Sequence, residues 1–157
     1  MDSVCRLVNT LESPEKIKVL APVYLKEILY YLLKGEGGKF VRHYMKEGSS
    51  AQKVVQAITL IKDQFTESLN VSDLADQVGM SESSLYSIFK KITNMSPLQF
   101  QKTLRLQTAK QLLTLNNLPV NETAYKVGYE SPSQFSREYS RMYGVSPKAD
   151  AMKVPAV

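Results

Sequence analysis

Apolar residues recur at helical spacing along almost the whole chain. A half-buried strand would alternate apolar and polar residues, whereas a helix that packs on one face repeats its apolar positions every three or four residues. Almost no segment shows the alternating pattern, and the helical pattern is found from the first residues to the last tenth of the sequence. The sequence therefore predicts an all-α protein.

The first fifty residues predict a helical hairpin followed by a linker. A short apolar stripe over residues 4–11 ends before Pro14, and a second helix from Pro22 to Lys34 carries a wide apolar face. Glycines at 35–38 stop this helix, and the sequence EGSS at 47–50 is typical of a short linker. Because a wide apolar face needs cover, we expect this segment to pack against another part of the protein or against a second chain.

A stretch of about twenty residues occurs twice in the remainder of the chain. Residues 79–97 read GMSESSLYSIFKKITNMSP, and residues 128–147 read GYESPSQFSREYSRMYGVSP, with one residue inserted in the second copy. The positions that match are nearly all apolar or turn-forming, which are the positions that a small packed unit has to keep. The matched pairs are Ala75 with Ala124, Val78 with Val127, Gly79 with Gly128, Leu85 with Phe135, Phe89 with Tyr139, Ile92 with Met142, and Asn94 with Gly144.

Each copy predicts a helix-turn-helix, at about 71–93 and 120–143. A short helix leads into a glycine turn and then into a longer helix, and in such motifs the second helix lies in the major groove of DNA. The longer helices place their matched apolar residues on one face and residues that differ between the copies on the other. This is the pattern expected of one scaffold that reads two different base sequences. The expected inward residues are Leu85, Ile88, Phe89 and Ile92 in the first copy, and Phe135, Tyr139 and Met142 in the second.

A long helix over residues 96–115 is predicted to join the two units. Ser96 can cap its first turn, Pro97 suits the first helical position, and Gln99 completes a capping box. Asn94 suits the left-handed conformation that closes the preceding helix. A further helix at 51–65 comes before the first unit.

Charge is distributed in blocks. The net charge is +5, residues 63–82 hold five acids and no Lys or Arg, and residues 83–117 hold five bases and no Asp or Glu. A basic stripe that begins inside a predicted reading helix is the electrostatic pattern of a phosphate-binding surface. A solvated helix face could carry the same number of bases. The charge distribution therefore supports a phosphate-binding surface only in combination with the repeat.

The sequence lacks the motifs typical of enzymes, metal-binding proteins and membrane proteins. His43 is the only histidine and Cys5 the only cysteine, so neither a Cys/His metal motif nor an internal disulfide is expected, and no nucleophile elbow or Walker loop is present. The glycines at 35–38 lack phosphate-loop spacing. Three charges and a proline interrupt the most apolar stretch, 17–33, and the N-terminus has no secretory pattern. We therefore expect no enzyme activity, metal, cofactor or membrane insertion, and a cytoplasmic location.

The repeated region resembles the AraC/XylS family of bacterial transcriptional regulators. The sequence at 128–147 is similar to the family signature through its second helix-turn-helix, LADQVGMSESSLYSIFKKITNMSPLQFQ resembles the first, and LRLQTAKQLL resembles the linker helix. The resemblance covers about residues 51–148. The sequence LAPVYLKEILYYLLKGEGG resembles the end of the regulatory or dimerisation half in one subgroup, so we expect residues 1–50 to be a remnant of that half, and residues 51–157 to be the DNA-binding domain of a longer regulator.

The resemblance implies two helix-turn-helix units that read successive major-groove turns on one face of DNA. Two alternatives stay open for several positions: Gln134 is a candidate for a base contact or for capping from Ser131, Tyr86 for a base contact or for packing, and Arg137 for a guanine or a phosphate. The implied base-reading residues are Ser83, Tyr86, Ser87, Ser133, Gln134 and Arg137. The expected phosphate contacts are Lys90, Lys91, Lys102, Arg105, Ser136 and Arg141.

The expected partner is a double-stranded DNA operator. RNA polymerase and a second copy of the chain, bound through the N-terminal segment, are further candidate partners, and a small-molecule effector would bind the missing N-terminal region. The alternative is a helical protein-interaction module that does not bind DNA. At Ser87 family members often carry arginine, which implies less direct base readout by the first unit.

Overall fold

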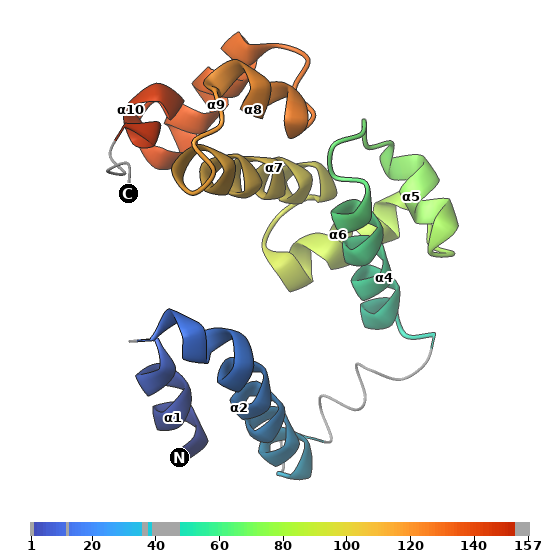
Figure 1. Ribbon diagram of the computed structural model, residues 1–157. Helices are drawn as coiled ribbons and strands as arrows, with labels where there is room; N and C mark the ends of the chain where they lie inside the picture. Colours follow the sequence, from blue (N-terminus) through green and yellow to red (C-terminus); the bar gives the residue numbers. More distant parts are fainter. Residues whose placement is uncertain (1, 12, 36–37, 39–47, 153–157) are drawn as a thin grey trace. The chain divides into compact units, whose positions relative to one another are not determined.

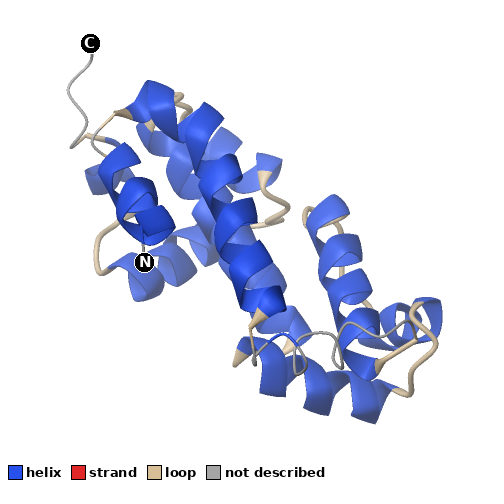
Figure 2. Cartoon of the chain, turned by 90° about the horizontal axis from the view of Figure 1, so that it is seen from below, coloured by secondary structure: helices blue, strands red, loops and turns tan. Residues whose placement is uncertain are grey.

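The computed structural model describes residues 2–11, 13–35, 38 and 48–152, and every regular element in those ranges is an α-helix (Figure 2). The all-α prediction is therefore confirmed. The chain divides into an N-terminal part, residues 1–52, and a C-terminal part, residues 53–157. The expected turn at 35–38 and the linker at 47–50 lie partly outside the described residues, and His43 lies outside them entirely.

The N-terminal part contains a hairpin of α1 (Asp2–Thr10) and α2 (Pro14–Lys34). The prediction that the second helix begins at Pro22 was wrong, because α2 begins at Pro14 and continues through Pro22. Pro14 occupies the first turn, where a missing N–H costs nothing, whereas Pro22 removes a hydrogen bond within the helix. Arg6 joins the two helices, since its Nη2 donates to both carboxylate oxygens of Glu27 at 3.0 and 3.1 Å.

Much of the apolar surface of this hairpin is exposed within the described residues. Contacts between the two helices leave large side chains on their outer faces in solvent, as the wide apolar stripe of the sequence anticipates. Single exposed apolar residues are ordinary, but here they lie together on two adjacent helices. The exposed side chains are Val4, Val8, Leu11, Val19, Val23, Leu25, Leu29, Tyr30, Tyr31 and Leu32.

The C-terminal part begins within α4 (Ser50–Asp63) and contains two three-dimensional copies of one motif. The first helix-turn-helix unit is formed by α5 (Val71–Gln77) and α6 (Glu82–Thr93), and the second by α8 (Val120–Lys126) and α9 (Pro132–Tyr143). Between them runs α7 (Pro97–Thr114), and α10 (Pro147–Ala151) follows the second unit. Figure 1 shows α7, in yellow, with α4–α6 near one end and α8–α10 near the other.

Each unit has its own hydrophobic core, and α7 contributes to both. Phe100, near the start of α7, packs edge-on against Phe89 of the first core, with ring centroids 5.6 Å apart. Leu106, Ala109 and Leu113, near its end, are buried in the second core. The first core otherwise comprises Val54, Ala57, Ile61, Leu74, Ala75, Val78, Leu85 and Phe89, and the second Ala124, Val127, Tyr129, Phe135 and Tyr139.

The local signals at helix ends are confirmed. Ser96 and Gln99 form the expected capping box, and Asn94 and Gly144 close α6 and α9 in the left-handed conformation, with φ of 58° and 72°. Ser96 Oγ accepts from the Gln99 amide at 3.2 Å, and Gln99 Oε1 accepts from the Ser96 amide at 3.0 Å. These caps set where α6 ends and α7 begins, and hence the direction in which α7 leaves the first unit.

Some predicted core positions were wrong. Ile92 and Met142, which match in the repeat, are 45% and 40% exposed, because each lies in the last turn of its helix beyond the edge of the small core. The helix predicted at 51–65 ends at Asp63, so Phe65 follows α4, and its side chain packs against the second core. The side chain of Phe65 therefore links the first unit to the second.

Candidate nucleic-acid interface

The outer face of α6 carries five exposed polar or basic residues. Leu85 and Phe89 are fully buried on the opposite face and fix the rotation of the helix. Tyr86 is 47% exposed, so packing does not bury its ring, and a ligand can reach it. The exposed residues are Ser83, Tyr86, Ser87, Lys90 and Lys91, all of which were predicted from the sequence to lie on this face.

The outer face of α9 is also polar and basic, but it carries different side chains. Phe135 and Tyr139 are fully buried and hold the helix as Leu85 and Phe89 hold α6. Ser133, Gln134, Arg137 and Arg141 are exposed, and Ser136 is half-buried. The two recognition helices, by which we mean α6 and α9, thus share a buried face and differ on their exposed face.

Serine caps start both recognition helices. Ser81 Oγ accepts from the Ser84 amide at 3.4 Å, and Ser131 Oγ accepts from the Gln134 amide at 3.3 Å. The Gln134 side chain does not return to the cap; instead its Nε2 lies 3.5 Å from Glu138 Oε1. Only the backbone of Gln134 takes part in capping, and its side chain is exposed with one long contact, to Glu138.

Four of the predicted cations are exposed and lack an ion pair within the part of the chain that the structure describes. They are Lys90 and Lys91 in the last turn of α6, and Arg137 and Arg141 on α9. Because these charges are not compensated by neighbouring carboxylates, they create a positive potential on the same faces that carry the exposed polar side chains. An anionic polymer is the ligand that such a surface attracts.

Lys102 and Arg105 of α7, which were predicted to contact phosphate, both have partners within the protein. Lys102 Nζ lies 3.4 Å from Glu138 Oε1, so its charge is compensated. Arg105 Nε donates to the Phe65 carbonyl at 2.6 Å, while Nη1 and Nη2 donate to the carbonyls of Gly128 and Glu67 at 2.8 and 2.7 Å. Three of the five N–H groups of Arg105 are therefore used on backbone oxygens within the protein.

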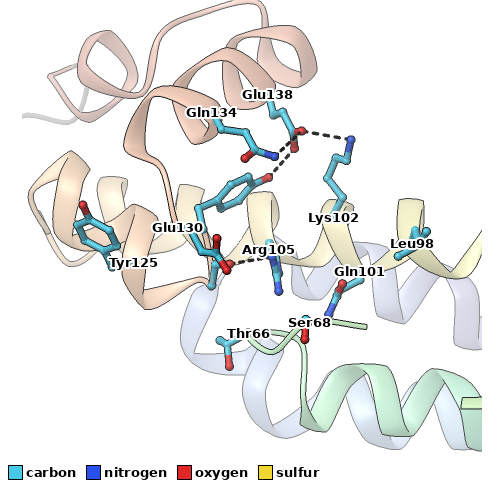
Figure 3. Close-up of a pocket in the computed structure, with 12 residues that line it drawn as sticks. Thr66, Ser68, Leu98, Gln101, Lys102, Arg105, Tyr125, Glu130, Gln134 and Glu138 are labelled. Carbon is cyan, nitrogen blue, oxygen red and sulfur yellow. Dashed lines mark hydrogen bonds and ion pairs between the residues drawn. The ribbon is translucent and has the colours of Figure 1, made fainter. Parts of the chain in front are cut away.

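Beside these residues a cleft of about 640 Å³ opens between α7, the α4–α5 loop and the second unit. In Figure 3, Glu138 lies between Gln134 and Lys102, and Arg105 extends from α7 toward the second unit. The Tyr129 hydroxyl also donates to Glu138 Oε2, at 2.8 Å. Glu138 therefore ties α9 to α7 through Lys102 and to the turn of its own unit through Tyr129.

Burial and hydrogen bonding shift the titration of this cluster. Burial alone would raise the pKa of the Glu138 carboxyl, but hydrogen bonds from Tyr129 and Gln134 and the nearby Lys102 ammonium lower that pKa below its ordinary value. Burial and the bond to Glu138 raise the pKa of Tyr129, and burial lowers the pKa of Arg105. At neutral pH the cluster thus holds an ionised Glu138 between a protonated tyrosine and a lysine.

The turn glycines differ in their surroundings. Gly79 and Gly128 both have positive φ, 64° and 87°, a conformation that other residues adopt only with strain. A β-carbon on Gly79 would meet only Lys53 Nζ at 3.6 Å, whereas a β-carbon on Gly128 would clash with the Thr66 carbonyl oxygen and lie 2.7 Å from the Thr66 Cα. Of these two glycines, only Gly128 is pressed against the backbone of another element.

The sequence reasoning missed the residues that join the two units. Backbone carbonyls have no sequence signature, so the acceptors at residues 65, 67 and 128 could not be found. A signal did exist for the donors: Gln101 and Arg105 occupy the same i, i+4 series as Pro97, Ala109 and Leu113, which are buried. Gln101 Nε2 donates to the Glu67 carbonyl at 2.8 Å. Polar residues on an apolar stripe indicate internal contacts.

The described residues contain no group of three His, Cys, Asp or Glu side chains that could hold a metal ion. None of the described helices combines the length and the hydropathy that a membrane span requires.

Comparison with known families matches both parts of the chain. The family described as "Helix-turn-helix domain" matches residues 74–151, and the family described as "AraC-type transcriptional regulator N-terminus" matches residues 1–40. The lactose operon transcription activator of Staphylococcus xylosus is 26% identical over 144 residues, which make up 91% of this chain and 50% of that protein. The chain spans half or less of the length of the curated relatives that it matches first.

Solved structures match the C-terminal part. An AraC-type transcriptional regulator of Chromobacterium violaceum has 27% identity and a TM-score of 0.62, with 68% of this chain and 97% of that chain covered. The DNA-binding domain of AdpA, described as a global transcriptional factor and solved in complex with a target DNA, has 27% identity and a TM-score of 0.60, with coverages of 64% and 90%.

The Glu138 cluster generates a pH-dependent prediction. We expect Glu138→Gln to lower the free energy of unfolding at pH 7 by about 1–2 kcal/mol, because the amide loses charge-assisted hydrogen bonds. The pKa of Glu138 is depressed, so its contribution is present above the ordinary value of 4.5 and is lost as pH falls through the lower folded-state pKa. Denaturant unfolding of wild type and variant at pH 7 and near pH 3 should show the difference shrinking.

Glu130 lines the same cleft and is exposed, so Glu130→Gln is the matched control. We expect this variant to change the free energy of unfolding little at either pH. If the stability difference between the wild type and the Glu138→Gln variant stays constant from pH 7 to pH 3, the assigned ionisation is contradicted.

Proposed function

The chain belongs to the AraC/XylS family of transcriptional regulators, and we propose that it binds an operator by placing α6 and α9 in two successive major-groove segments. One observation carries the proposal: the two helices share their buried residues and expose different polar and basic ones. A DNA-bound neighbour with the same fold supports it. Within a cell we place the regulator in the cytoplasm, where its operator would be.

The length of α7 suits this arrangement. Its 18 residues give a helix of about 27 Å, at 1.5 Å per residue, with one unit packed near each end. Successive major-groove segments on one face of DNA recur every helical turn, about 34 Å. The linker helix together with the widths of the units it joins can therefore place two recognition helices one turn apart.

The exposed residues divide into two proposed roles. Short and polar side chains at the start and middle of each recognition helix are proposed to meet base edges, and the uncompensated cations to meet phosphates. Lys102 and Arg105 are left out of the phosphate set because of their internal contacts. We propose base contacts for Ser83, Tyr86, Ser87, Ser133, Gln134 and Arg137, and phosphate contacts for Lys90, Lys91, Ser136 and Arg141.

The remaining proposed partners are a small-molecule effector, RNA polymerase and a second copy of the chain. We propose that a small-molecule effector, where one exists, binds a region outside this chain, and that RNA polymerase contacts the regulator at the promoter. The exposed apolar surface of the α1–α2 hairpin favours a further interaction, which we propose is with a second copy of the chain.

Arg137 provides the sharpest test of base readout. Its exposed guanidinium can form two hydrogen bonds to the O6 and N7 of one guanine. We expect Arg137→Ala to weaken binding to the best site by about 1–3 kcal/mol and to flatten preference at one base pair. The best site comes from selection out of a random duplex pool, and affinities are then measured on a panel of its single-base variants.

Lys90→Ala is the matched control for a phosphate contact, because Lys90 is also exposed and unpaired in the described residues. It should weaken every duplex alike and reduce the salt dependence of binding by about one ion. An equal loss on every duplex for Arg137→Ala would mean that Arg137 contacts phosphate instead. A wild-type chain that retards no duplex would favour the alternative, a protein-interaction module.

The hairpin proposal is tested by sedimentation. We expect the chain to self-associate at micromolar concentrations and residues 51–157 to be monomeric, because the exposed apolar side chains belong to α1 and α2. Val23→Glu together with Leu29→Glu, on the outer face of α2, should abolish association without removing the Arg6–Glu27 contact between the helices. Monomers for all three proteins would exclude the homodimer.

A further inference from the structure

We infer that Arg105, Gly128 and residues 65–67 form a junction that fixes the separation of the two recognition helices and thereby selects the spacing of the two DNA segments. We call this set the inter-unit junction. The inference rests on the proposed function, since spacing has meaning only if both α6 and α9 enter grooves. Its residues act through α6 and α9 and are positioning residues, not DNA contacts.

The hydrogen bonds from Arg105 run to both units. The side chain leaves α7 and donates to the carbonyls of Phe65 and Glu67, in the loop that follows α4 of the first core, and to the carbonyl of Gly128, in the turn of the second unit. A guanidinium is planar and holds its donors in fixed directions. Three acceptors from two units are therefore held in one rigid arrangement around a single side chain.

The backbones of the two units also approach each other directly. Gly128 lies so close to Thr66 that a β-carbon would clash with its carbonyl oxygen and fall 2.7 Å from its Cα. Real β-carbons do not approach so closely, so any other residue at 128 would force the turn of the second unit away from the loop. The absence of a side chain at 128 thus sets the distance between the units.

Further contacts surround the junction on both sides. The Phe65 side chain packs against the second core while its carbonyl accepts from Arg105. Gln101 adds a second donor to the Glu67 carbonyl, at 2.8 Å, from one turn earlier on α7. The Arg105 guanidinium lies 5.8 Å from the centre of the Tyr129 ring, next to Gly128. Loop, turn and linker helix therefore move as one body.

The consequence for DNA follows from the geometry of the duplex. Each inserted base pair moves the second segment by about 3.4 Å and rotates it by about 35° around the axis. A protein whose recognition helices are rigidly spaced cannot follow that change with both helices. A protein with a loosened junction can follow it, but it binds the original site more weakly.

The experiment uses the full chain and the duplex obtained by selection, with zero, one or two base pairs inserted between the two protected segments. We expect the wild type to lose at least about tenfold in affinity per insertion, since each mismatched contact in a site typically costs about 1–3 kcal/mol. Gly128→Ala and Arg105→Lys should bind the parent duplex more weakly and lose less than about threefold on insertion, because either unit can then follow its own segment. Arg105→Lys keeps the positive charge, so a phosphate role for Arg105 would be largely retained in it.

Gly79→Ala is the matched control. It imposes the same positive-φ strain in the equivalent turn, but its β-carbon meets no backbone. Both glycine variants should have lower midpoints of denaturant unfolding than the wild type. Only Gly128→Ala should change the ratio between the affinity for a duplex with inserted base pairs and the affinity for the parent duplex. A purely structural role for Gly128 would lower the midpoint and leave that ratio at the wild-type value, which would overturn the inference.

A DNA-free measurement separates this inference from the proposed function. Spin labels at Gln77→Cys on α5 and Glu122→Cys on α8, in a chain with Cys5→Ser, report the distance between the units; all three positions are exposed. We expect one narrow distance distribution, which broadens or shifts in Gly128→Ala and Arg105→Lys and not in Gly79→Ala. An unchanged distribution in the first two variants would overturn the junction even if DNA binding is normal. The chain could also show a narrow distribution that broadens in Gly128→Ala and Arg105→Lys and yet bind no duplex. That result would support the junction, but it would overturn both the proposed function and the role of the junction in DNA spacing.

Discussion

A partly buried guanidinium on the linker helix determines how the two halves of the DNA-binding part are placed. Arg105 cannot lose its charge at any physiological pH, so its burial requires oxygen acceptors for its N–H groups. The structure supplies three, from the α4–α5 loop and from the turn of the second unit. The relative placement of α6 and α9 depends on this contact together with α7, which packs into both cores, and with Phe65, which packs against the second.

Within each unit the architecture follows from a small set of repeated residues. An alanine, a valine and a positive-φ glycine recur in the short helix and turn, and two large apolar or aromatic side chains recur in the longer helix. These apolar residues are buried in both copies, so they account for the fold and leave the outer faces unconstrained by packing. The freedom of those outer faces is what allows one motif to present Ser83, Tyr86 and Ser87 in one place and Gln134 and Arg137 in the other.

Local features were the most predictable from the sequence. The end of α6 at Thr93, the capping box at Ser96 and the left-handed closure at Asn94 depend on residues within a few positions of one another, and all were predicted correctly. Features that depend on contacts between distant parts of the chain were not predicted from the sequence. Arg105 lies 23 to 40 positions from its backbone acceptors, and neither the approach of Gly128 to Thr66 nor the packing of Phe65 in the second core has a local signal. Ile92 and Met142 fit the helical pattern, but small cores end before the last turn reaches them.

The central claim is that α6 and α9 occupy successive major-groove segments on one face of DNA. Hydroxyl-radical footprinting of the chain on its selected duplex tests this most directly, because the cleavage pattern reports protection at each nucleotide of both strands. The account predicts two protected patches on one face with centres about 10–10.5 base pairs apart. A single protected patch, or two patches half a turn apart on opposite faces of the duplex, would contradict it.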